Sequence, residues 1–477
     1  MYGDFSRRIG EQHKHYSRLL QQQGRLPLDA DFNELGESIL RYLQQFVIDA
    51  IGPYGTAVGS NGFKITFEGH ALKVGAGFYY LSGMRCDSTG KTAARDQDPV
   101  PRGNALEYVL RSNVPFVLQE PPPDLAYLVV LRAWERTVTA AQDPGLSDAA
   151  FQAFGDTVVR SQLVWQVLAL TVLPEEAAIT IEEEDETKEE KEEDDFRDEG
   201  DELRKMRRKG RPALLAWKRY ERQVTRGAKL SRGQLCAEVV PESAPYVRNE
   251  LHRVEVHVGG SMEDCSFKHS RDNGSTLFAF EVLAAPSSEL LEVRLSGTSD
   301  ALSGLKCGLW LEYIDDMCRP PGQAPMYEIT VVSSREGVVT IRGSGLPSGN
   351  ADLHPRLRQW DHHRRGDRLE WSRTEEIGHA GQQKEQFTAT MRLGNLLIVT
   401  VRSGEQPFHS GDSWTILMRS SIGGPVWRDD GAGQAGFEDP ERFNYHEAPL
   451  ALLSKKNDIV DLRSTFYGSA IWEPRSD

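Results

Sequence analysis

CSFKHSRDNGSTLFAFEVL, residues 265–283, carries the clearest folding signal in this chain of 477 residues. Two runs with aromatic and apolar side chains flank Asp272-Asn273-Gly274, and Asn-Gly readily adopts the positive φ angles of a tight turn between antiparallel strands. The stretch therefore predicts a strand, a hairpin turn and a second strand.

Comparable runs, rich in β-branched and aromatic residues and bounded by turn-forming residues, recur through most of the sequence. They include FKITFEG (63–69), ALKVGAGFYYLSGMRCD (71–87), AYLVVLRAWERTVTA (126–140), SQLVWQVLALTVL (161–173) and RNELHRVEVHVGG (248–260). Strands do not alternate with helices, and no repeat of about 20–50 residues occurs. The pattern predicts a mainly β protein of the α+β class, in which an N-terminal helical segment precedes several small antiparallel β domains.

The N-terminal segment, residues 1–51, is predicted to be helical. Apolar residues recur at helical spacing over residues 35–51, and Gly52-Pro53 ends the helix. Gly24-Arg25, followed by Leu-Pro-Leu, predicts a bend between two helices. The pair Asp29-x-Asp31 is interpreted as a cap at the positive end of the second helix.

Shifts in composition along the chain predict six consecutive segments. They are an N-terminal helical docking segment (1–55), a first β-rich domain (56–178), a charged insertion or linker (179–212), a second β domain (213–300), a small β-barrel-like unit (301–345) and a C-terminal β-rich domain (346–477).

The formal charge of −15 comes mostly from residues 182–202, which hold fifteen acids and three bases. Without this stretch the remainder carries −15 + 12 = −3, so no broad basic face for nucleic acid is expected. The stretch is interpreted as a solvated insertion, with a dock for a basic partner as the alternative. No apolar run is long enough to span a bilayer, and the N-terminus has no signal-peptide pattern. The five cysteines, without a C-x-x-C pair, are expected to be buried reduced thiols.

Motif searches predict no catalytic residue, no cofactor and no metal site. A metal site from Asp29, Asp31, His13 and His15 is disfavoured, because two helical histidines two residues apart point to different faces. His252 and His257 lie five apart and face opposite sides of a strand.

Three further groups are given structural interpretations. The run Trp360-Asp361-His362-His363-Arg364-Arg365-Gly366-Asp367 is interpreted as a polar loop. Glu312 and Asp316 form a weak candidate for the carboxylate pair of a glycoside hydrolase. Trp134 and Trp165, on apolar strands, are expected in the core or an interface.

The segment KHYSRLLQQQGRLPLDADFNE, residues 14–34, resembles the N-terminal signature of a family of poorly characterised proteins encoded with phage-tail-like contractile injection systems. Later blocks agree in order, among them VGAGFYYLSGMRCD, YLVVLRAWERTVTA, ELHRVEVHVGG, LWLEYIDD and GDSWTILMRSSIGGPVW. Phe32 and His269 stand where the family pattern usually has Trp, and the acidic stretch has no counterpart in that pattern.

The resemblance implies a non-enzymatic structural component of the particle, at the baseplate as a collar or cage around spike and tube. Its expected partners are baseplate, spike, tube or sheath subunits, and its expected assembly is a six-fold or three-fold ring of copies. The protein would be cytoplasmic during assembly and then part of a released or membrane-docked particle. No role within the chain itself is assigned to the N-terminal segment, and the segment is interpreted as the docking site. The docking residues are His15, Tyr16, Arg18, Gln22, Gln23, Arg25, Asp29, Asp31 and Phe32.

Two alternatives remain open at this point. The first is a glycan- or receptor-binding tail accessory that uses aromatic faces such as Trp310, Trp371, Trp414 and Trp427. The second is a hydrolase of cell wall or glycan, which requires two acids converging in a cleft.

Overall fold

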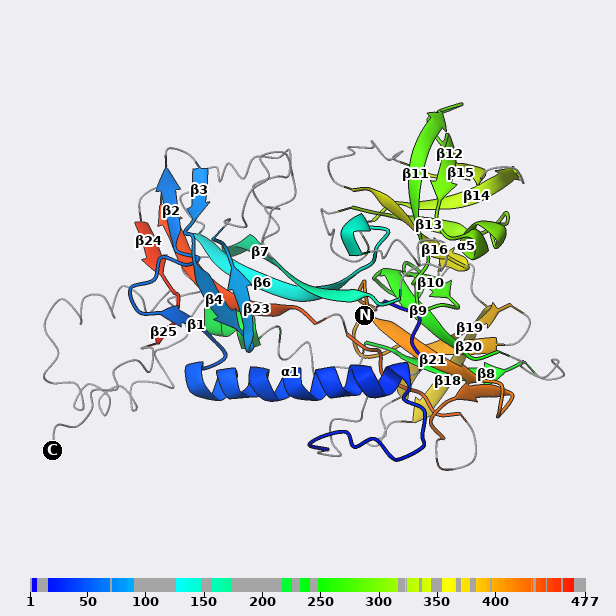
Figure 1. Ribbon diagram of the computed structural model, residues 1–477, viewed down its shortest axis with the longest axis horizontal. Helices are drawn as coiled ribbons and strands as arrows, with labels where there is room; N and C mark the ends of the chain where they lie inside the picture. Colours follow the sequence, from blue (N-terminus) through cyan, green and yellow to red (C-terminus); the bar gives the residue numbers. More distant parts are fainter. Residues whose placement is uncertain are drawn as a thin grey trace, which may run out of the picture. The chain divides into compact units, whose positions relative to one another are not determined.

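The computed structural model has a mainly β architecture with one long helix near the N-terminus, which confirms the predicted fold class (Figure 1). It describes residues 2–6, 16–68, 71–89, 126–146, 157–172, 217–222, 224, 232–240, 248–315, 322, 324–333, 337–344, 354–365, 370–377, 383–394, 397–429, 431, 435–442, 444–455 and 458–466. Among these residues no helix has the length and apolar character needed to cross a membrane. The acidic stretch 182–202 lies outside the described residues.

The chain folds into two compact units, each drawn from three separate stretches. Unit 1 takes residues 1–38, 137–161 and 227–443, and unit 2 takes residues 39–136, 162–226 and 444–477. Each unit combines separate stretches because strands distant in sequence pair with one another.

Unit 1 contains a five-stranded antiparallel sheet in the order β17-β10-β9-β21-β22. Strand β9 is buried along nearly its whole length on both faces, so its charged and polar side chains face the interior. The strands are β9 Glu250–Val258, β10 Ser266–Ser270, β17 His362–Arg365, β21 Ser413–Arg419 and β22 Gly424–Val426.

A second sheet of unit 1, in the order β18-β19-β20-β8, shares a core with the first. Leu235, Met391 and Val399 of this sheet pack in one cluster with Val254 and Trp414 of the five-stranded sheet. The strands are β8 Gln234–Val239, β18 Glu370–Ile377, β19 Gln383–Leu393 and β20 Leu397–Arg402.

The third part of unit 1 is a closed six-stranded barrel, in the order β11-β12-β15-β14-β13-β16, which spans residues 277–360. Its interior is filled by apolar side chains such as Phe278, Leu311 and Tyr327. The elements are β11 Leu277–Ala284, β12 Leu290–Ser296, α5 Ser299–Ser303, β13 Trp310–Ile314, β14 Met326–Ser333, β15 Val338–Arg342 and β16 Arg356–Trp360.

The Asp272-Asn273-Gly274 turn connects the five-stranded sheet to the barrel. Asn273 and Gly274 have φ angles of 52° and 66°, as the sequence predicts for a tight turn. The hairpin prediction is wrong, however, because β10 pairs with β9 and β17 whereas β11 pairs with β12 and β16. The Asp272 carboxylate fixes the turn by accepting hydrogen bonds from the backbone N–H groups of Gly274 and Thr276.

Unit 2 joins strands from both ends of the chain. One sheet has the order β25-β1-β4-β5, a second the order β24-β23-β6-β7, and β2 pairs with β3. Trp165 is buried in the core of this unit and Trp134 is also buried, as expected. The strands are β1 Tyr54–Ala57, β2 Ile65–Glu68, β3 Ala71–Val74, β4 Phe78–Leu81, β5 Met84–Asp87, β6 Ala126–Val138, β7 Arg160–Val172, β23 His446–Lys455, β24 Asp458–Asp461 and β25 Thr465–Phe466. A 3-10 turn, η2 Pro144–Leu146, lies between β6 and β7.

The long helix α1 spans Asp29–Ile51. It ends as predicted, because Gly52, with φ 99°, donates its N–H to the carbonyl of Ile48 at 2.7 Å. The prediction of helix over residues 1–51 is wrong for the described residues 2–6 and 16–28. Gly24 adopts φ 69° in a turn, and Pro27 disfavours helical geometry in the residue before it.

Candidate functional site

The N-terminus of α1 is capped by one of the two predicted acids. Asp31 accepts a hydrogen bond from the backbone N–H of Leu28 at 3.0 Å, the reciprocal half of a capping box. Asp29 instead accepts the backbone N–H of Ser6 at 2.8 Å. The capping interpretation holds for Asp31, while Asp29 ties the start of the helix to the N-terminal arm, residues 2–6.

Residues 16–28 form a non-helical segment that ends where Asp29, the first residue of α1, contacts Ser6. Within this segment, the N–H of Arg25 donates a turn hydrogen bond to the carbonyl of Gln22 at 3.3 Å. The side chain of Gln21 also donates to the carbonyl of Arg25 at 3.1 Å. We call residues 16–28 the docking loop.

Nearly all of the predicted docking residues that the structure describes are exposed. Tyr16 and Phe32 are 70% and 67% exposed, and only Asp31 is half-buried. His15 lies outside the described residues. The remaining exposed members of the set are Arg18, Gln22, Gln23, Arg25 and Asp29.

The docking loop also exposes large apolar side chains. Tyr16, Leu20 and Leu26 are 70%, 72% and 89% exposed. Covering such side chains would remove apolar area from water, which is favourable.

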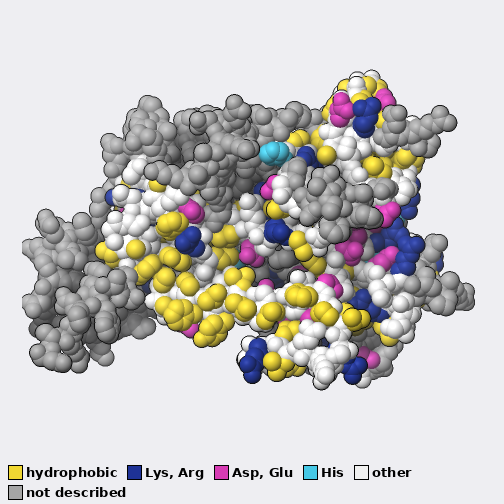
Figure 2. Space-filling model, viewed as in Figure 1, with side chains coloured by type: hydrophobic (Ala, Val, Ile, Leu, Met, Phe, Trp, Pro, Cys, Tyr) yellow, Lys and Arg dark blue, Asp and Glu magenta, His cyan; other side chains and the backbone are white. Residues whose placement is uncertain are grey.

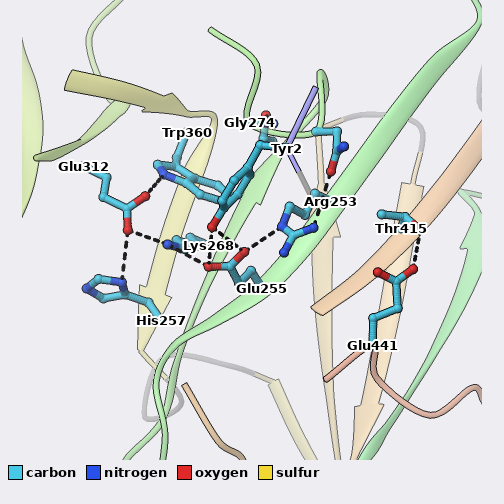
Figure 3. Close-up of polar contacts among 12 residues, drawn as sticks. Tyr2, Arg253, Glu255, His257, Lys268, Gly274, Glu312, Trp360, Thr415 and Glu441 are labelled. Carbon is cyan, nitrogen blue, oxygen red and sulfur yellow. Dashed lines mark hydrogen bonds and ion pairs between the residues drawn. The ribbon is translucent and has the colours of Figure 1, made fainter. Parts of the chain in front are cut away.

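The N-terminal arm is anchored by Tyr2 in a buried group of charged residues that the sequence did not reveal. The Tyr2 hydroxyl donates to the Glu255 carboxylate, with distances of 3.0 and 2.9 Å to its two oxygens (Figure 3). The guanidinium carbons of Arg253 and Arg358 lie 4.6 and 3.7 Å from the centre of the Tyr2 ring. The Trp360 and Tyr2 rings pack edge-on, with 6.3 Å between their centres.

Lys268 links the two carboxylates of this group, which we call the anchor cluster: Arg253, Glu255, His257, Lys268, Glu312, Arg358 and Trp360. Its ammonium lies 2.6 Å from Glu312 and 3.0 Å from Glu255. Arg253 donates to Glu255 at 2.6 Å, and the indole N–H of Trp360 donates to Glu312 at 2.9 Å. Every member is buried, so the charges are compensated by one another rather than by water.

The anchor cluster holds its ionisable groups in fixed protonation states at neutral pH. Burial alone would raise the pKa of Glu255, but the Lys268 and Arg253 charges lower it to about 2. Burial and the nearby Lys268 charge lower the pKa of His257 to about 4, so its imidazole is neutral. Burial alone would lower the pKa of Lys268, but Glu255 and Glu312 raise it. In these states the Glu255 carboxylate is ionised and accepts the hydrogen bond of the Tyr2 hydroxyl.

The backbone of the arm completes the anchor. The N–H of Tyr2 donates to the Thr137 hydroxyl at 3.2 Å. The Asn273 side-chain amide donates to the carbonyl of Gly3 at 2.9 Å, and the Gly3 N–H donates back to the Asn273 carbonyl at 3.3 Å. A Cβ at Gly274 would lie 2.8 Å from the Tyr2 ring, so the Asn-Gly turn leaves room for Tyr2.

Sequence reasoning missed the anchor cluster because its members span residues 253–360 and meet only in the folded protein. A local signal did exist: Arg253, Glu255 and His257 share one face of β9, and Glu255 lies directly opposite Lys268 of β10. A lysine inside an otherwise buried strand requires a buried carboxylate partner.

The other histidine and carboxylate candidates have structural roles where they are described. His252 and His257 face opposite sides of β9, as expected; His252 contacts His269 and Glu250, each at 3.0 Å. Glu312 is committed to Lys268 and Trp360, whereas Asp316 lies outside the described residues. Among the described residues no group of three or more His, Cys, Asp or Glu could hold a metal ion.

The run that begins at Trp360 is not a polar loop in its described part. Trp360 is fully buried, Asp361 accepts two hydrogen bonds from Arg271, and His362–Arg365 form β17. Gly366 and Asp367 lie outside the described residues. The prediction failed because the strand pairing of β17 with β10 is non-local.

The tryptophans considered for glycan binding are largely engaged in packing. Trp414 is buried and donates its indole N–H to the carbonyl of Glu438 at 2.9 Å. Trp427 packs against the same core and donates to Gly436 at 2.8 Å. Trp310 is half-buried and contacts the His363 ring, and the side chain of Trp371 lies outside the described residues.

The described cysteines are free thiols. Cys86, Cys236 and Cys265 are buried, as expected, but Cys307 is exposed. Cys318 lies outside the described residues.

Residues 1–202 match a family described as a family of unknown function (DUF6519). No curated protein and no solved structure matches the chain. The matched residues include the N-terminal arm, the docking loop and α1.

Proposed function

We propose that this protein is a non-enzymatic structural component of a contractile, phage-tail-like injection particle, where it acts at the baseplate by multi-copy assembly. One observation carries the proposal: the docking loop, directly before α1, exposes Tyr16, Leu20 and Leu26 to water. A segment with large apolar side chains on its surface favours association with another protein.

The anchor cluster supports this function by positioning the loop. Tyr2 fixes the arm on unit 1, and Ser6 of the same arm holds Asp29 at the start of α1. Restraining the end of the docking loop at Asp29 before binding lowers the conformational entropy lost on docking. In this scheme the buried charges act through the arm and never touch the partner.

The sequence resemblance supplies the class of particle and the neighbours. Baseplate, spike, tube or sheath subunits receive the docking loop, and several copies form a collar or cage around the spike or tube. A ring closes through heterologous contacts, which fits six-fold or three-fold copy number. Assembly takes place in the cytoplasm, before release or membrane docking of the particle.

The test is incorporation of a loop variant into purified particles. Tyr16→Ala combined with Arg25→Ala removes two exposed side chains from the docking loop, so the variant should fold but remain outside the particle. Particle fractions are examined for the 53.5 kDa band. The matched control is Val331→Ala with Arg294→Ala, which truncates exposed side chains on the barrel and should incorporate normally. Normal incorporation of the loop variant would contradict the proposal.

A further inference from the structure

Helix α1 presents its apolar stripe to water. The stripe consists of Phe32, Leu35, Ile39, Leu43 and Phe46, all exposed, with exposed Tyr42 beside it. Figure 2 shows hydrophobic side chains gathered where Figure 1 draws α1. Amphipathic helices of globular proteins normally turn such a stripe toward the core.

The helix is seated by its other side, so rotation cannot bury the stripe. Ala30 is the buried residue of the helix, and Glu34, Arg41 and Gln44 on the same side are partly covered. The backbone of Gln44 is in tight contact with Gly83: a Cβ there would lie 2.5 Å from the Gln44 carbonyl oxygen. At 100° per residue, Arg41 lies about 160° from Ile39 around the helix. The side that carries Ala30, Arg41 and Ile48 is therefore the inner side, opposite the exposed stripe.

The stripe is a palindrome. Its residues read Phe, Leu, Ile, Leu, Phe, with spacings of 3, 4, 4 and 3 residues about Ile39. A two-fold axis that relates two antiparallel copies would place Ile39 against Ile39, Leu35 against Leu43 and Phe32 against Phe46. Such self-complementarity is what an isologous interface requires.

We propose that α1 is a dimerisation helix, and that the partner which covers its stripe is α1 of a second copy, in antiparallel orientation. In this arrangement each positive helix N-terminus lies beside a negative C-terminus, which is favourable. A parallel pair would align like ends of the two helix dipoles and would not use the palindrome.

The stripe is large enough to contribute a specific contact. It extends over fifteen residues from Phe32 to Phe46, a rise of about 21 Å along the helix. Phe32, Tyr42 and Phe46 are 67%, 75% and 61% exposed. Each side chain therefore has on the order of 130 Å² of accessible surface that a partner could bury. The three rings together supply about half of the ~800 Å² per partner that is typical of a specific interface. Leu35, Ile39 and Leu43 add to this area.

This pairing goes beyond the proposed ring and is compatible with it. The two-fold contact uses α1, whereas docking to neighbours uses the loop of residues 16–28. A three-fold ring built from such pairs contains six copies. The pairing does not depend on which particle the protein joins.

The first experiment measures self-association of the full chain by sedimentation velocity. Unaltered protein should be a dimer, and Ile39→Glu should weaken dimerisation about 100-fold or more, because it sets two like charges together at the two-fold axis. Ile39 is exposed in the single chain, so this change should not affect folding, which far-UV circular dichroism checks. Asn33→Glu, an exposed change outside the stripe, is the matched control and should leave the dimer intact.

The second experiment determines orientation by oxidative cross-linking in a Cys307→Ser, Cys318→Ser background. This background removes the exposed thiol of the described residues and the cysteine that lies outside them. Ile39→Cys should link to itself. Phe32→Cys alone should not, but Phe32→Cys mixed with Phe46→Cys should link the two copies. Linkage of Phe32→Cys to itself would overturn the antiparallel arrangement, and a monomer at every concentration would overturn the pairing altogether. The loop variant Tyr16→Ala with Arg25→Ala should still dimerise, which separates failure of this inference from failure of the proposed function.

Discussion

Replacement of Tyr2 by Phe should release the N-terminal arm without unfolding unit 1. The change removes only the hydroxyl, which donates to the Glu255 carboxylate at 2.9–3.0 Å. Glu255 keeps Lys268 and Arg253 as partners, so no buried charge is left alone. The ring also keeps its contacts with Arg253 and Arg358.

The expected loss is that of one hydrogen bond to a charged group, about 1.5–3 kcal/mol. Since about 1.4 kcal/mol corresponds to a tenfold change in an equilibrium constant, the arm should detach roughly 10- to 100-fold more often. Tyr2→Ala removes the ring as well, so it should increase detachment of the arm further. The largest possible increase is set by the total free energy with which the arm binds.

Native-state hydrogen exchange measures this equilibrium directly. The N–H groups of Gly3 and Ser6 are bonded to Asn273 and Asp29, so both should exchange roughly 10- to 100-fold faster in Tyr2→Phe. The amides of β9 should be unchanged. Tyr16→Phe, the same substitution at an exposed tyrosine, is the control and should leave all of these rates unaltered. Unchanged exchange at Gly3 and Ser6, or equal acceleration in β9, would refute the reasoning that Tyr2 anchors the arm.

Three further predictions concern the same cluster. The pKa of His257 is lowered to about 4 in the folded protein and is about 6.5 in the unfolded chain, so between these values the unfolded chain binds an extra proton and stability falls as the pH drops. The His257→Gln variant should therefore show a flatter dependence of the urea midpoint on pH between 6.5 and 4. An unaltered slope would count against this prediction. Lys268→Met leaves Glu255 and Glu312 buried without their shared cation and should lower the free energy of unfolding by about 3–5 kcal/mol in denaturant. The control Lys306→Met, at an exposed position, should lower it by less than ~0.5 kcal/mol. A loss below ~1 kcal/mol for Lys268→Met would show that the ion pairs are dispensable. Gly274→Ala places a Cβ against the Tyr2 ring and should accelerate amide hydrogen exchange at Gly3 and Ser6. The control Gly308→Ala, also at positive φ but with open space around it, should leave these exchange rates unchanged. Equal acceleration in the two variants would assign the effect to backbone strain alone.

The sequence predicted the parts of this structure that depend on local chemistry. Strand-forming runs, the Asn273-Gly274 turn and the Gly52 helix end each follow from the conformational preferences of a few adjacent residues. The same turn also shows the limit of prediction from local sequence, because its φ angles do not determine which strands pair. Here β10 and β11 enter different sheets, and no property of residues 265–283 distinguishes that outcome from a hairpin.

Helical spacing misled in the N-terminal segment for a similar reason. The N-terminal arm, residues 2–6, takes its conformation from Thr137 and Asn273, more than 130 residues away in sequence. Tertiary contacts of this kind override propensities worth a few tenths of a kcal/mol per residue, about the ordinary range. The exposure of Tyr16, Leu20 and Leu26 follows from their position in a segment to which local reasoning assigns no role within the chain, whereas the anchor cluster forms from residues distant in sequence.

The charges of the anchor cluster explain why the arm completes unit 1 and is more than an attachment to it. Three cations, Arg253, Lys268 and Arg358, face only two buried carboxylates, Glu255 and Glu312. The Tyr2 ring places its electron-rich faces over two of these cations, and its hydroxyl donates to one of the carboxylates. Removing the arm would withdraw both contributions from a buried site, where compensation by water is weakest. Arm docking and the stability of the cluster are thus coupled, and a partner that pulled on the docking loop would act on the interior of unit 1 through Ser6 and Tyr2.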